Sequence, residues 1–333
     1  MSEIIDLPEP QRVATGKKGV IASAHWRASE AGARMLAKGG NAVDAAVATA
    51  FALGVCEPAA SGLGGQTKML IHLADPRQTI ALDGSSRAPH RTVPQTLSRA
   101  EQLRGWSAST VPSTPAALGY ALEAHGTLSL REVLEPAIEL ALEGYPISEL
   151  QARLTHREVE SLRKGSAGAI FLDRKHEPRV PGTVFRQPVL AKTLRGMADR
   201  GWLDFYQGEI AAVIAEDMEN QDGLIRLDDL AQVPTPIERR PVAGKFESLR
   251  LLTFPPPGAG RMLLAILNFI AQFPGGRRTV DTPEGALVLA EVIRQANQDR
   301  RDHPLEPNIY TQIDDKVMLG AEHAKQVAQR IRR

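Results

Sequence analysis

Residues 39–48 read Gly39-Gly40-Asn41-Ala42-Val43-Asp44-Ala45-Ala46-Val47-Ala48. The two glycines end a preceding helical pattern, and Asn41 can cap a new helix that we expect over residues 42–55. Alanines dominate this helix and permit close approach of its neighbours, while Asp44 is its only charged residue. We therefore predict a buried helix, with Asn41 as its cap and Asp44 as a hydrogen-bonding residue that stabilises the fold.

The segments on either side of this stretch predict further elements. Upstream, residues 19–23 have the composition of a short strand, and apolar residues at helical spacing predict a helix before Gly39. Downstream, residues 69–73 and 79–82 are two β-like runs joined by a four-residue turn that contains Pro76. We expect an antiparallel hairpin there, preceded by a glycine-rich loop at residues 61–66.

The rest of the chain is predominantly helical in pattern, with several starts marked by capping residues. The predicted helices span residues 130–143, 148–163, 188–199, 209–219, 260–272, 283–301 and 318–331, and a short strand is expected at 249–254. So few strands are unusual for a mixed fold of 333 residues. We therefore expect residues absent from this chain to complete the sheet.

Composition and charge exclude several classes of protein. The chain has 43% apolar and 24% charged residues, as in ordinary globular proteins, and its length permits two domains or one large layered fold. With 40 basic and 39 acidic residues the net charge is +1, so neither nucleic acid nor a membrane is an expected partner. Cys56, the single cysteine, lies in an apolar run and is predicted to be a buried thiol. Residues 1–18 lack the apolar stretch of a secretory signal, which predicts a cytoplasmic protein.

Motifs for three common chemistries fail on their spacing. The loop at 62–68 lacks the Gly-Lys-Ser/Thr order of a phosphate-binding loop, so it is interpreted as a tight turn. The eight histidines form no pair at the spacing of metal ligands, and no Gly-x-Ser-x-Gly elbow is present. We therefore expect no metal, no cofactor and no self-contained active site on this chain.

Several segments, in chain order, resemble signatures of the γ-glutamyltranspeptidase family. Residues 39–48 resemble its GGNAVDAAVA signature, and residues 61–71 its NLGGGGFMLI stretch. The remaining matches, to DFREMAP, VPGTVAG, EFYKG, GGLIT-x-EDL, PPPSSGG and ADR, lie at residues 83–89, 111–119, 204–208, 223–230, 255–260 and 299–300. The resemblance covers roughly residues 18 to 325.

The resemblance implies a mixed α/β (α+β) fold, an αββα sandwich of the N-terminal nucleophile (Ntn) hydrolase type. Members of the family are precursors that cut themselves into a large and a small chain, and this sequence resembles the large chain only. It therefore predicts one large-subunit domain over residues 1–333, with residues 1–17 as an N-terminal arm. The sheet of this helix-rich half would be completed by the small subunit.

The resemblance also implies where the chemistry lies. The family's nucleophile is a threonine that begins the small chain, and the matching segment would follow Arg333, so no catalytic residue is expected on this chain. A new N-terminal threonine carries a hydroxyl and a free α-amine, whose reference pKa of about 8 suits a general base. Acyl transfer would then proceed through an ester to water or an amine, as in the glutathione metabolism of the family.

The expected substrate site departs from the family pattern. In the family, an arginine of the DFREMAP stretch pairs with the α-carboxylate of the γ-glutamyl group, and alignment places Ser85 at that position. A hydroxyl cannot replace the two charge-assisted hydrogen bonds of a guanidinium. Arg87 is either a substrate-carboxylate ligand or a structural arginine, while Ser85 and Ser86 either line the pocket or form a turn. Residues 66–68 also replace glycines and an aromatic residue of the family loop.

Three functions remain for comparison. The first is the large subunit of a γ-glutamyltranspeptidase-like amidohydrolase or acyltransferase, whose partner is a small subunit with an N-terminal threonine. Its substrate would be a γ-glutamyl compound or another small amide. The second function is that of a related amidase, which acts on an oxamate-like or cephalosporin-like acyl group, and Ser85 favours it. The third is a binding or scaffold protein without a catalytic partner. A dimer of heterodimers stays open as the higher assembly.

Overall fold

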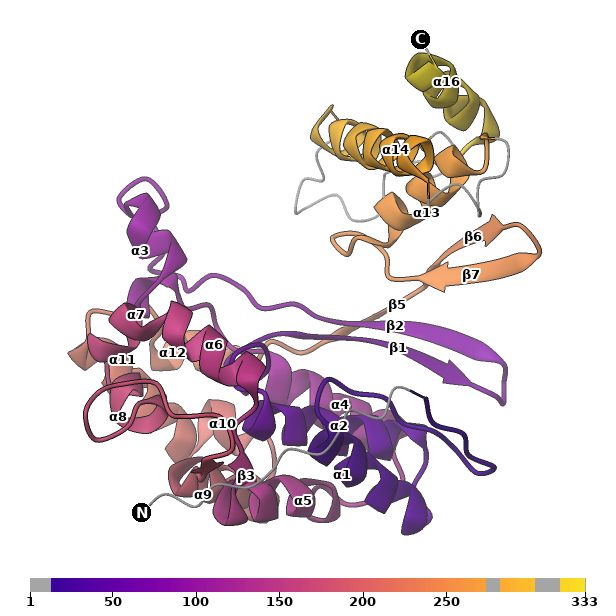
Figure 1. Cartoon of the computed structure of the whole chain (residues 1–333). Helices are drawn as coiled ribbons and strands as arrows, with labels where there is room; N and C mark the ends of the chain where they lie inside the picture. The colour runs from indigo at the N-terminus through magenta and orange to yellow at the C-terminus, as the bar shows by residue number, and fades with distance from the viewer. Residues whose placement is uncertain (1–12, 274–281, 303–317, 333) are drawn as a thin grey trace. The chain divides into compact units, whose positions relative to one another are not determined.

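The computed structural model describes residues 13–273, 282–302 and 318–332 (Figure 1). Contacts divide the chain into two compact units, the first within Met1–Lys68 and Asp83–Ile237 and the second within Met69–Leu82 and Glu238–Arg333. Residues 13–25 contain no helix or strand, and the start of the predicted N-terminal arm lies outside the described residues. The single domain predicted over residues 1–333 stays a prediction.

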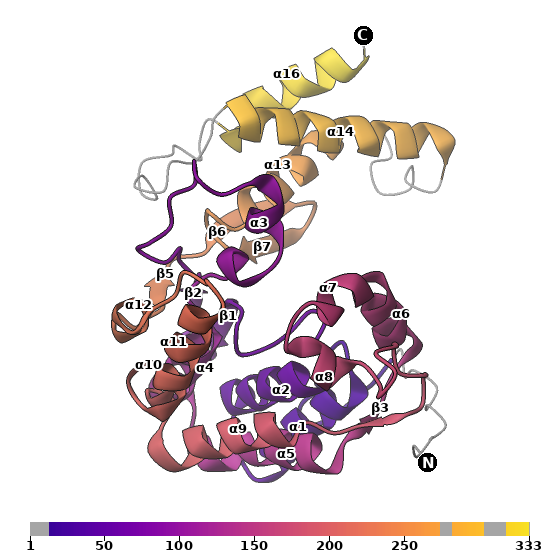
Figure 2. The same ribbon diagram turned by 90° about the vertical axis from the view of Figure 1, so that its left-hand side faces the viewer.

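Helices that pack around α2 (Ala42–Cys56) form the core of the first unit (Figures 1 and 2). This helix packs against α1 (Trp26–Ala37), α4 (Thr114–His125) and α5 (Leu130–Glu143), and α5 also packs against α9 (Pro188–Arg200). Small side chains allow these close contacts, since Ala45, Ala48 and Ala52 of α2 are buried. The alanine-rich stretch therefore forms the buried helix that the sequence predicts.

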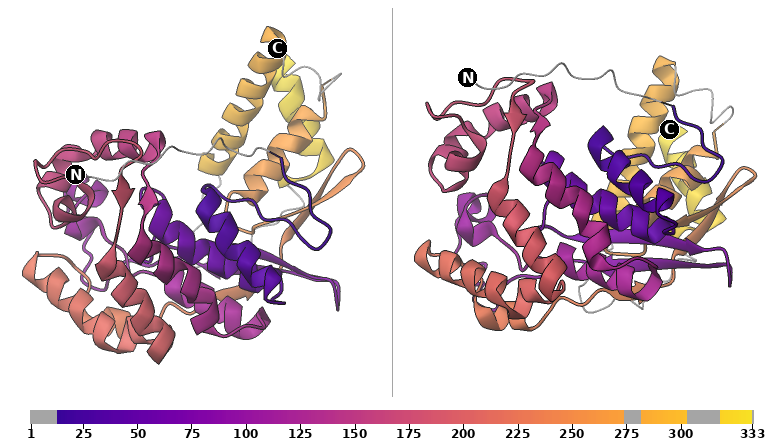
Figure 3. Two further views of the ribbon diagram at one scale, coloured as in Figure 1. Left: turned by 60° about the horizontal axis from the view of Figure 1, so that its bottom comes forward. Right: turned by 90° about the horizontal axis from the view of Figure 1, so that it is seen from below.

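Shorter elements complete the first unit, as Figure 3 shows from two further directions. Strands β3 (Tyr145–Pro146) and β4 (Val184–Phe185) pair antiparallel. The remaining helices are α3 (Arg99–Leu103), η1 (Trp106–Ala108), α6 (Glu149–Arg157), α7 (Val159–Arg163), α8 (Ala167–Phe171), α10 (Asp204–Gln207), α11 (Glu209–Asn220) and α12 (Leu227–Ala231). The last three pack on one another.

Two small sheets lie at the start of the second unit. One has the strand order β1 (Thr67–Leu73), β2 (Gln78–Gly84), β5 (Ile237–Arg239). The other pairs β6 (Val242–Phe246) with β7 (Leu249–Thr253) antiparallel, with Val242 opposite Thr253. The predicted hairpin is thus confirmed as β1 and β2.

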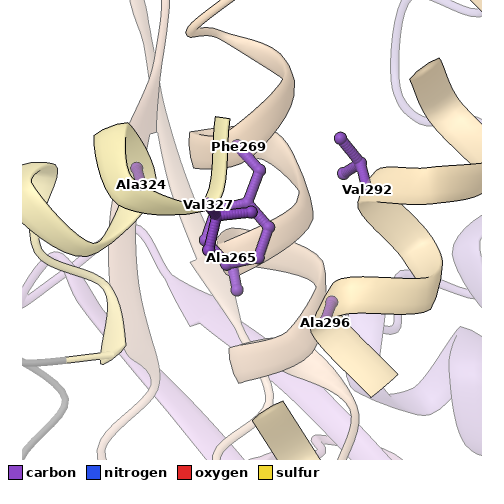
Figure 4. Packing of buried hydrophobic residues seen from close by; sticks show 6 residues of the cluster. All are labelled: Ala265, Phe269, Val292, Ala296, Ala324 and Val327. Atoms are coloured by element: carbon purple, nitrogen blue, oxygen red, sulfur yellow. The ribbon is translucent and has the colours of Figure 1, made fainter. Parts of the chain in front are cut away.

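Three helices form the other part of the second unit, namely α13 (Gly260–Ile270), α14 (Pro283–Asp302) and α16 (Ala321–Arg332). Their shared core is shown in Figure 4 and consists of Ala265, Phe269, Val292, Ala296, Ala324 and Val327. Phe269 supplies the largest side chain of this cluster, and alanines let the three helices approach it. None of the described helices combines the length and the apolar character needed to cross a bilayer.

Most predicted helices are confirmed, whereas two details are wrong. The helix predicted at 148–163 is divided into α6 and α7 at Glu158, whose φ of −103° and ψ of 9° leave the helical region. Residues 19–23, predicted as a strand, form none, and no described strand pairs with them. A β-like composition does not make a strand without a partner for its backbone groups.

Candidate functional site

The candidate site lies in the first unit, where residues 85–91 follow strand β2. Three other segments meet this stretch: the glycine-rich loop at 61–66, the entry to α4 at 111–114, and the start of α12 at 226–229. All three contain matches to the family signatures quoted above. The stretch at 85–91 contains all three predicted site residues.

The entry to α4 holds the glycine loop and the end of β2 together. The carbonyl of Gly65 accepts hydrogen bonds from the amides of Ser113 (2.9 Å) and Thr114 (3.2 Å). The hydroxyl of Ser113 donates to the carbonyl of Gly84 at 2.6 Å. A Cβ on Gly84 would lie 2.5 Å from the Cβ of Ala117, so only glycine permits this close approach.

The two serines of the site are half-buried, and each has a partner within the loop region. The hydroxyl of Ser85 donates to Oδ1 of Asp83 at 2.6 Å. The amide of Ser86 donates to Oε1 of Gln66 at 3.2 Å. A hydroxyl has one hydrogen, so Ser85 in this conformation has none left for a substrate carboxylate. Gln66, where the family has glycine, adds a side-chain contact that fixes the loop.

Arg87 is anchored by its backbone and directed by its side chain toward α12. Its carbonyl accepts from the amide of Val111 at 2.9 Å. Its Nη2 lies 3.5 Å from the carbonyl oxygen of Asp229, at the long end of hydrogen-bonding distance. The structure therefore brings Arg87 against the first unit's own backbone, and its role as a carboxylate ligand stays a prediction.

Asp229 is the buried centre of this region, since its side chain is only 1% exposed. Its Oδ1 accepts from the amide of His90 at 2.7 Å and lies 2.8 Å from Nδ1 of the same residue. Its Oδ2 accepts from the amide of Arg226 at 2.9 Å. Arg91 donates to the neighbouring Asp228 at 2.9 Å, and this bond holds the pKa of Asp228 below its ordinary value. Sequence reasoning placed both aspartates in a motif but gave neither a role.

Asn41 and Asp44 lie away from this region and are confirmed as structural residues. The Asn41 side chain accepts from the amides of Val43 and Asp44 and thereby caps α2. Burial alone would raise the pKa of Asp44, but hydrogen bonds from Thr127, Leu128 and Asn41 lower it below its ordinary value. Asp44 therefore remains ionised and fixes the chain around the start of α2.

Two further groups bear on the chemistry of the chain. Cys56 is buried at the end of α2, and burial raises the pKa of its thiol to about 12. A thiol with so high a pKa is a poor nucleophile near neutral pH. Within residues 13–273, 282–302 and 318–332, no group of three or more His, Cys, Asp or Glu side chains is placed to hold a metal ion.

Comparison with known proteins decides the family. The Gamma-glutamyltranspeptidase family profile matches residues 28–333. This chain belongs to the γ-glutamyltranspeptidase family. The glutathione hydrolase proenzyme of Bacillus subtilis (strain 168) is 32% identical over 332 residues, which cover 97% of this chain and 56% of the relative. The chain thus spans about half the length of the curated relatives that it matches.

Solved structures agree with this assignment. The γ-glutamyltranspeptidase of Helicobacter pylori superimposes with a TM-score of 0.89 at 32% identity, covering 96% of this chain and 93% of that chain. A cephalosporin acylase from Bacillus halodurans superimposes with a TM-score of 0.80 at 26% identity, covering 98% of this chain and 63% of that chain. The mixed helix and sheet fold is therefore that of γ-glutamyltranspeptidase structures.

Proposed function

We propose that this chain is the large-subunit part of an Ntn amidohydrolase or acyltransferase whose nucleophile is the N-terminal threonine of a small subunit. One observation carries the proposal, namely the coverage of the relatives. The chain covers 93% of the solved H. pylori chain but only 56% of the B. subtilis proenzyme. The missing part of the proenzyme is large enough to supply the second chain.

The proposed reaction uses the threonine, an amide substrate and an acceptor, which is water or a second amine. The threonine hydroxyl attacks the amide carbonyl while the α-amine, with a reference pKa of about 8, accepts the hydroxyl proton. That proton passes to the departing amine when the C–N bond breaks, and an ester of the acyl group remains on the threonine. Water or a second amine then attacks the ester, releases the acyl product and restores the hydroxyl. In this scheme the segment with Ser85, Ser86 and Arg87 binds the acyl group.

The small subunit would also complete the fold as an αββα sandwich. In the described part of the chain, β1 lies at one edge of a three-stranded sheet, so its outer backbone groups can pair with another strand. Leu70 on β1 and Leu249 on β7 are 47% and 52% exposed. Strands and apolar side chains of a second chain would cover both features.

A specific observation favours a substrate without an α-amino carboxylate. Ser85 occupies the position of the family's carboxylate-binding arginine, and its hydroxyl donates to Asp83. The guanidinium of Arg87 lies near the Asp229 carbonyl. We therefore propose, as a second and narrower function, hydrolysis of an oxamate-like or cephalosporin-like acyl amide. The B. halodurans cephalosporin acylase shows that the same fold occurs in an acylase.

The decisive experiment identifies what accompanies the chain. Intact masses and N-terminal sequences of all species purified from the native source should reveal a second chain that begins with threonine. A stable chain without a companion would overturn the two-chain enzyme and favour the binding or scaffold protein. The same sample should then be assayed with γ-glutamyl-p-nitroanilide and with an acyl-p-nitroanilide that lacks the α-amino carboxylate. Faster turnover of the second compound supports the narrower proposal, and faster turnover of the first overturns it.

Arg87 gives an independent check on the substrate. If it binds a substrate carboxylate, Arg87→Ala raises KM for carboxylate-bearing amides and leaves KM for neutral ones unchanged. An equal effect on both classes assigns Arg87 to the structure of the loop. The cytoplasmic location and a dimer of heterodimers also remain proposals, which cell fractionation and light scattering test.

A further inference from the structure

We propose that the buried carboxylate of Asp229 is a positioning residue for the acyl-binding segment. It fixes the far end of residues 85–91, so that Ser85 and Ser86 are held in one conformation before substrate arrives. The inference rests on the proposed function, because it gives Asp229 a part in binding the substrate of that site.

Hydrogen bonds hold the segment at both ends. Before Ser85, the carbonyl of Gly84 accepts from the Ser113 hydroxyl at 2.6 Å. Behind the serines, the carbonyl of Arg87 accepts from the Val111 amide at 2.9 Å. The third contact is made by the amide of His90, which donates to Asp229 at 2.7 Å. Only this third contact comes from a side chain of α12, 139 residues further along the chain.

Burial makes the third contact strong. The Asp229 side chain is 1% exposed, and both its oxygens have partners. Oδ1 accepts from His90, and Oδ2 accepts from the amide of Arg226 and lies 3.7 Å from Nη1 of Arg91. A buried carboxylate depends on such donors, and hydrogen bonds to a charged group are about twice as strong as neutral ones. Since its acceptor positions face the protein's own donors, Asp229 acts on the substrate through the segment rather than by contact.

The adjacent residue supplies an internal control. Asp228 lies one position earlier on α12, but its side chain is 57% exposed and its bond to Arg91 joins two exposed side chains. Exposed ion pairs contribute little, because water screens them and both side chains lose freedom. The two aspartates therefore share a helix, a charge and the Arg91 guanidinium, whose Nη1 also lies 3.7 Å from Oδ2 of Asp229. They differ in burial, and Asp229 accepts from the backbone amides of His90 and Arg226.

The consequence concerns binding more than chemistry. A segment that is ordered in advance loses little conformational entropy when the substrate binds, whereas a loose one must be ordered by the substrate itself. The nucleophile of the proposed reaction belongs to another chain, so loss of this order raises KM and leaves kcat nearly unchanged.

The test compares Asp229→Asn with Asp228→Asn in the complete enzyme, purified with its companion chain. Asparagine has one accepting oxygen, and its NH2 group would face either the His90 amide or the Arg226 amide, both of which are donors. We therefore expect Asp229→Asn to raise KM about 3- to 10-fold with kcat within about twofold. Amide hydrogen exchange in residues 85–91 should become about tenfold faster. Asp228→Asn should leave KM and exchange at their wild-type values.

Several results would overturn the proposal. Wild-type KM and exchange in Asp229→Asn would do so, as would equal effects of the two substitutions. If Asp229→Asn does not fold, His90→Ala, which removes only the side-chain contact and keeps the amide, should give a smaller KM increase and faster local exchange. If the wild-type enzyme turns over no acyl amide, the proposed function fails, while the exchange comparison still decides whether Asp229 orders the segment.

Discussion

Asp44 and Asp229 are two buried carboxylates with the same local setting and different tasks. Each is the third residue of its helix, α2 or α12, and each accepts from the backbone amide three positions earlier. Asp44 also binds Thr127 and Leu128, which join α4 to α5. Asp229 instead binds His90, at the end of the segment that contains the site serines. The same arrangement at the start of a helix therefore has two different distant partners, the α4–α5 connection for Asp44 and the segment at 85–91 for Asp229.

The surroundings of the two carboxylates differ as well. Asp44 lies at the start of a 15-residue helix that packs on three others, and a Cβ on Gly126 would lie 2.7 Å from its Oδ1. Asp229 lies on a five-residue helix. The longer helix α2 contacts more of the core than α12 does. Removing the carboxylate of Asp44 should therefore lower the global stability more than removing that of Asp229.

The largest effect is expected from Asp44→Ala. Four donors around the carboxylate lose their acceptor, and we expect the free energy of unfolding to fall by about 3–5 kcal/mol. Urea denaturation followed by circular dichroism measures this change. A loss below about 1 kcal/mol would mean that water replaces the carboxylate. Asp44 would then not contribute more to global stability than Asp229.

Low pH should remove part of the stabilisation that the ionised Asp44 provides. The pKa of Asp44 is lowered in the folded chain, so its contribution is present above the ordinary aspartate pKa of about 3.9 and is lost as pH falls through the lower folded value. A protonated carboxyl still accepts some hydrogen bonds, so this loss is smaller than that of Asp44→Ala. Unfolding of wild type and Asp44→Asn between pH 6 and pH 3 tests it. Equal acid sensitivity in both proteins would contradict the assignment.

Asp229→Ala should destabilise the chain less than Asp44→Ala. Its loss frees the amides of His90 and Arg226, and we expect about 1–3 kcal/mol in urea denaturation. The matched control is Asp228→Ala, which should stay within about 0.5 kcal/mol of wild type. If Asp229→Ala destabilised as much as Asp44→Ala, Asp229 would be a core residue rather than a local clamp.

The smallest effect is expected from Thr127→Val. The substitution keeps the shape of the side chain but removes the hydroxyl that donates to Asp44 at 2.7 Å. We expect a loss of about 1–2 kcal/mol by urea denaturation, because the other three donors remain. Thr127→Ser keeps the hydroxyl and should lose less. Identical values for valine and serine would show that the hydroxyl contributes nothing measurable.

Local signals in the sequence predict much of the fold. Ser129 and Glu132 form the capping box that they suggest, and α5 has the bounds expected from it. Strand β6 was not predicted, because Gly244 interrupts its apolar pattern. A Cβ there would lie 2.6 Å from Cδ2 of Leu264 on α13, so glycine lets this helix pack closely on β6. The helix itself was predicted, but local sequence does not show which strand it packs against.

The sequence predicted the part of the candidate site that a family motif contains. The alignment of residues 83–89 placed Ser85 and Arg87 in the region, and the structure gives both a neighbour within hydrogen-bonding distance. The bond between His90 and Asp229 joins residues 139 positions apart, and nothing in either local sequence indicates the pairing. Long-range pairs of this kind follow from the packing of whole elements, which residue patterns do not specify.

The contact between His90 and Asp229 also selects a tautomer. Because Nδ1 lies 2.8 Å from Oδ1 of Asp229, the tautomer with its proton on Nδ1 is the one that can donate a hydrogen bond to the carboxylate. The His90 side chain is 53% exposed to solvent, whereas the side chain of Asp229 is 1% exposed. Nitrogen chemical shifts distinguish the two tautomers of histidine. His90 is therefore a built-in spectroscopic reporter, whose signal changes when the segment beside it leaves α12.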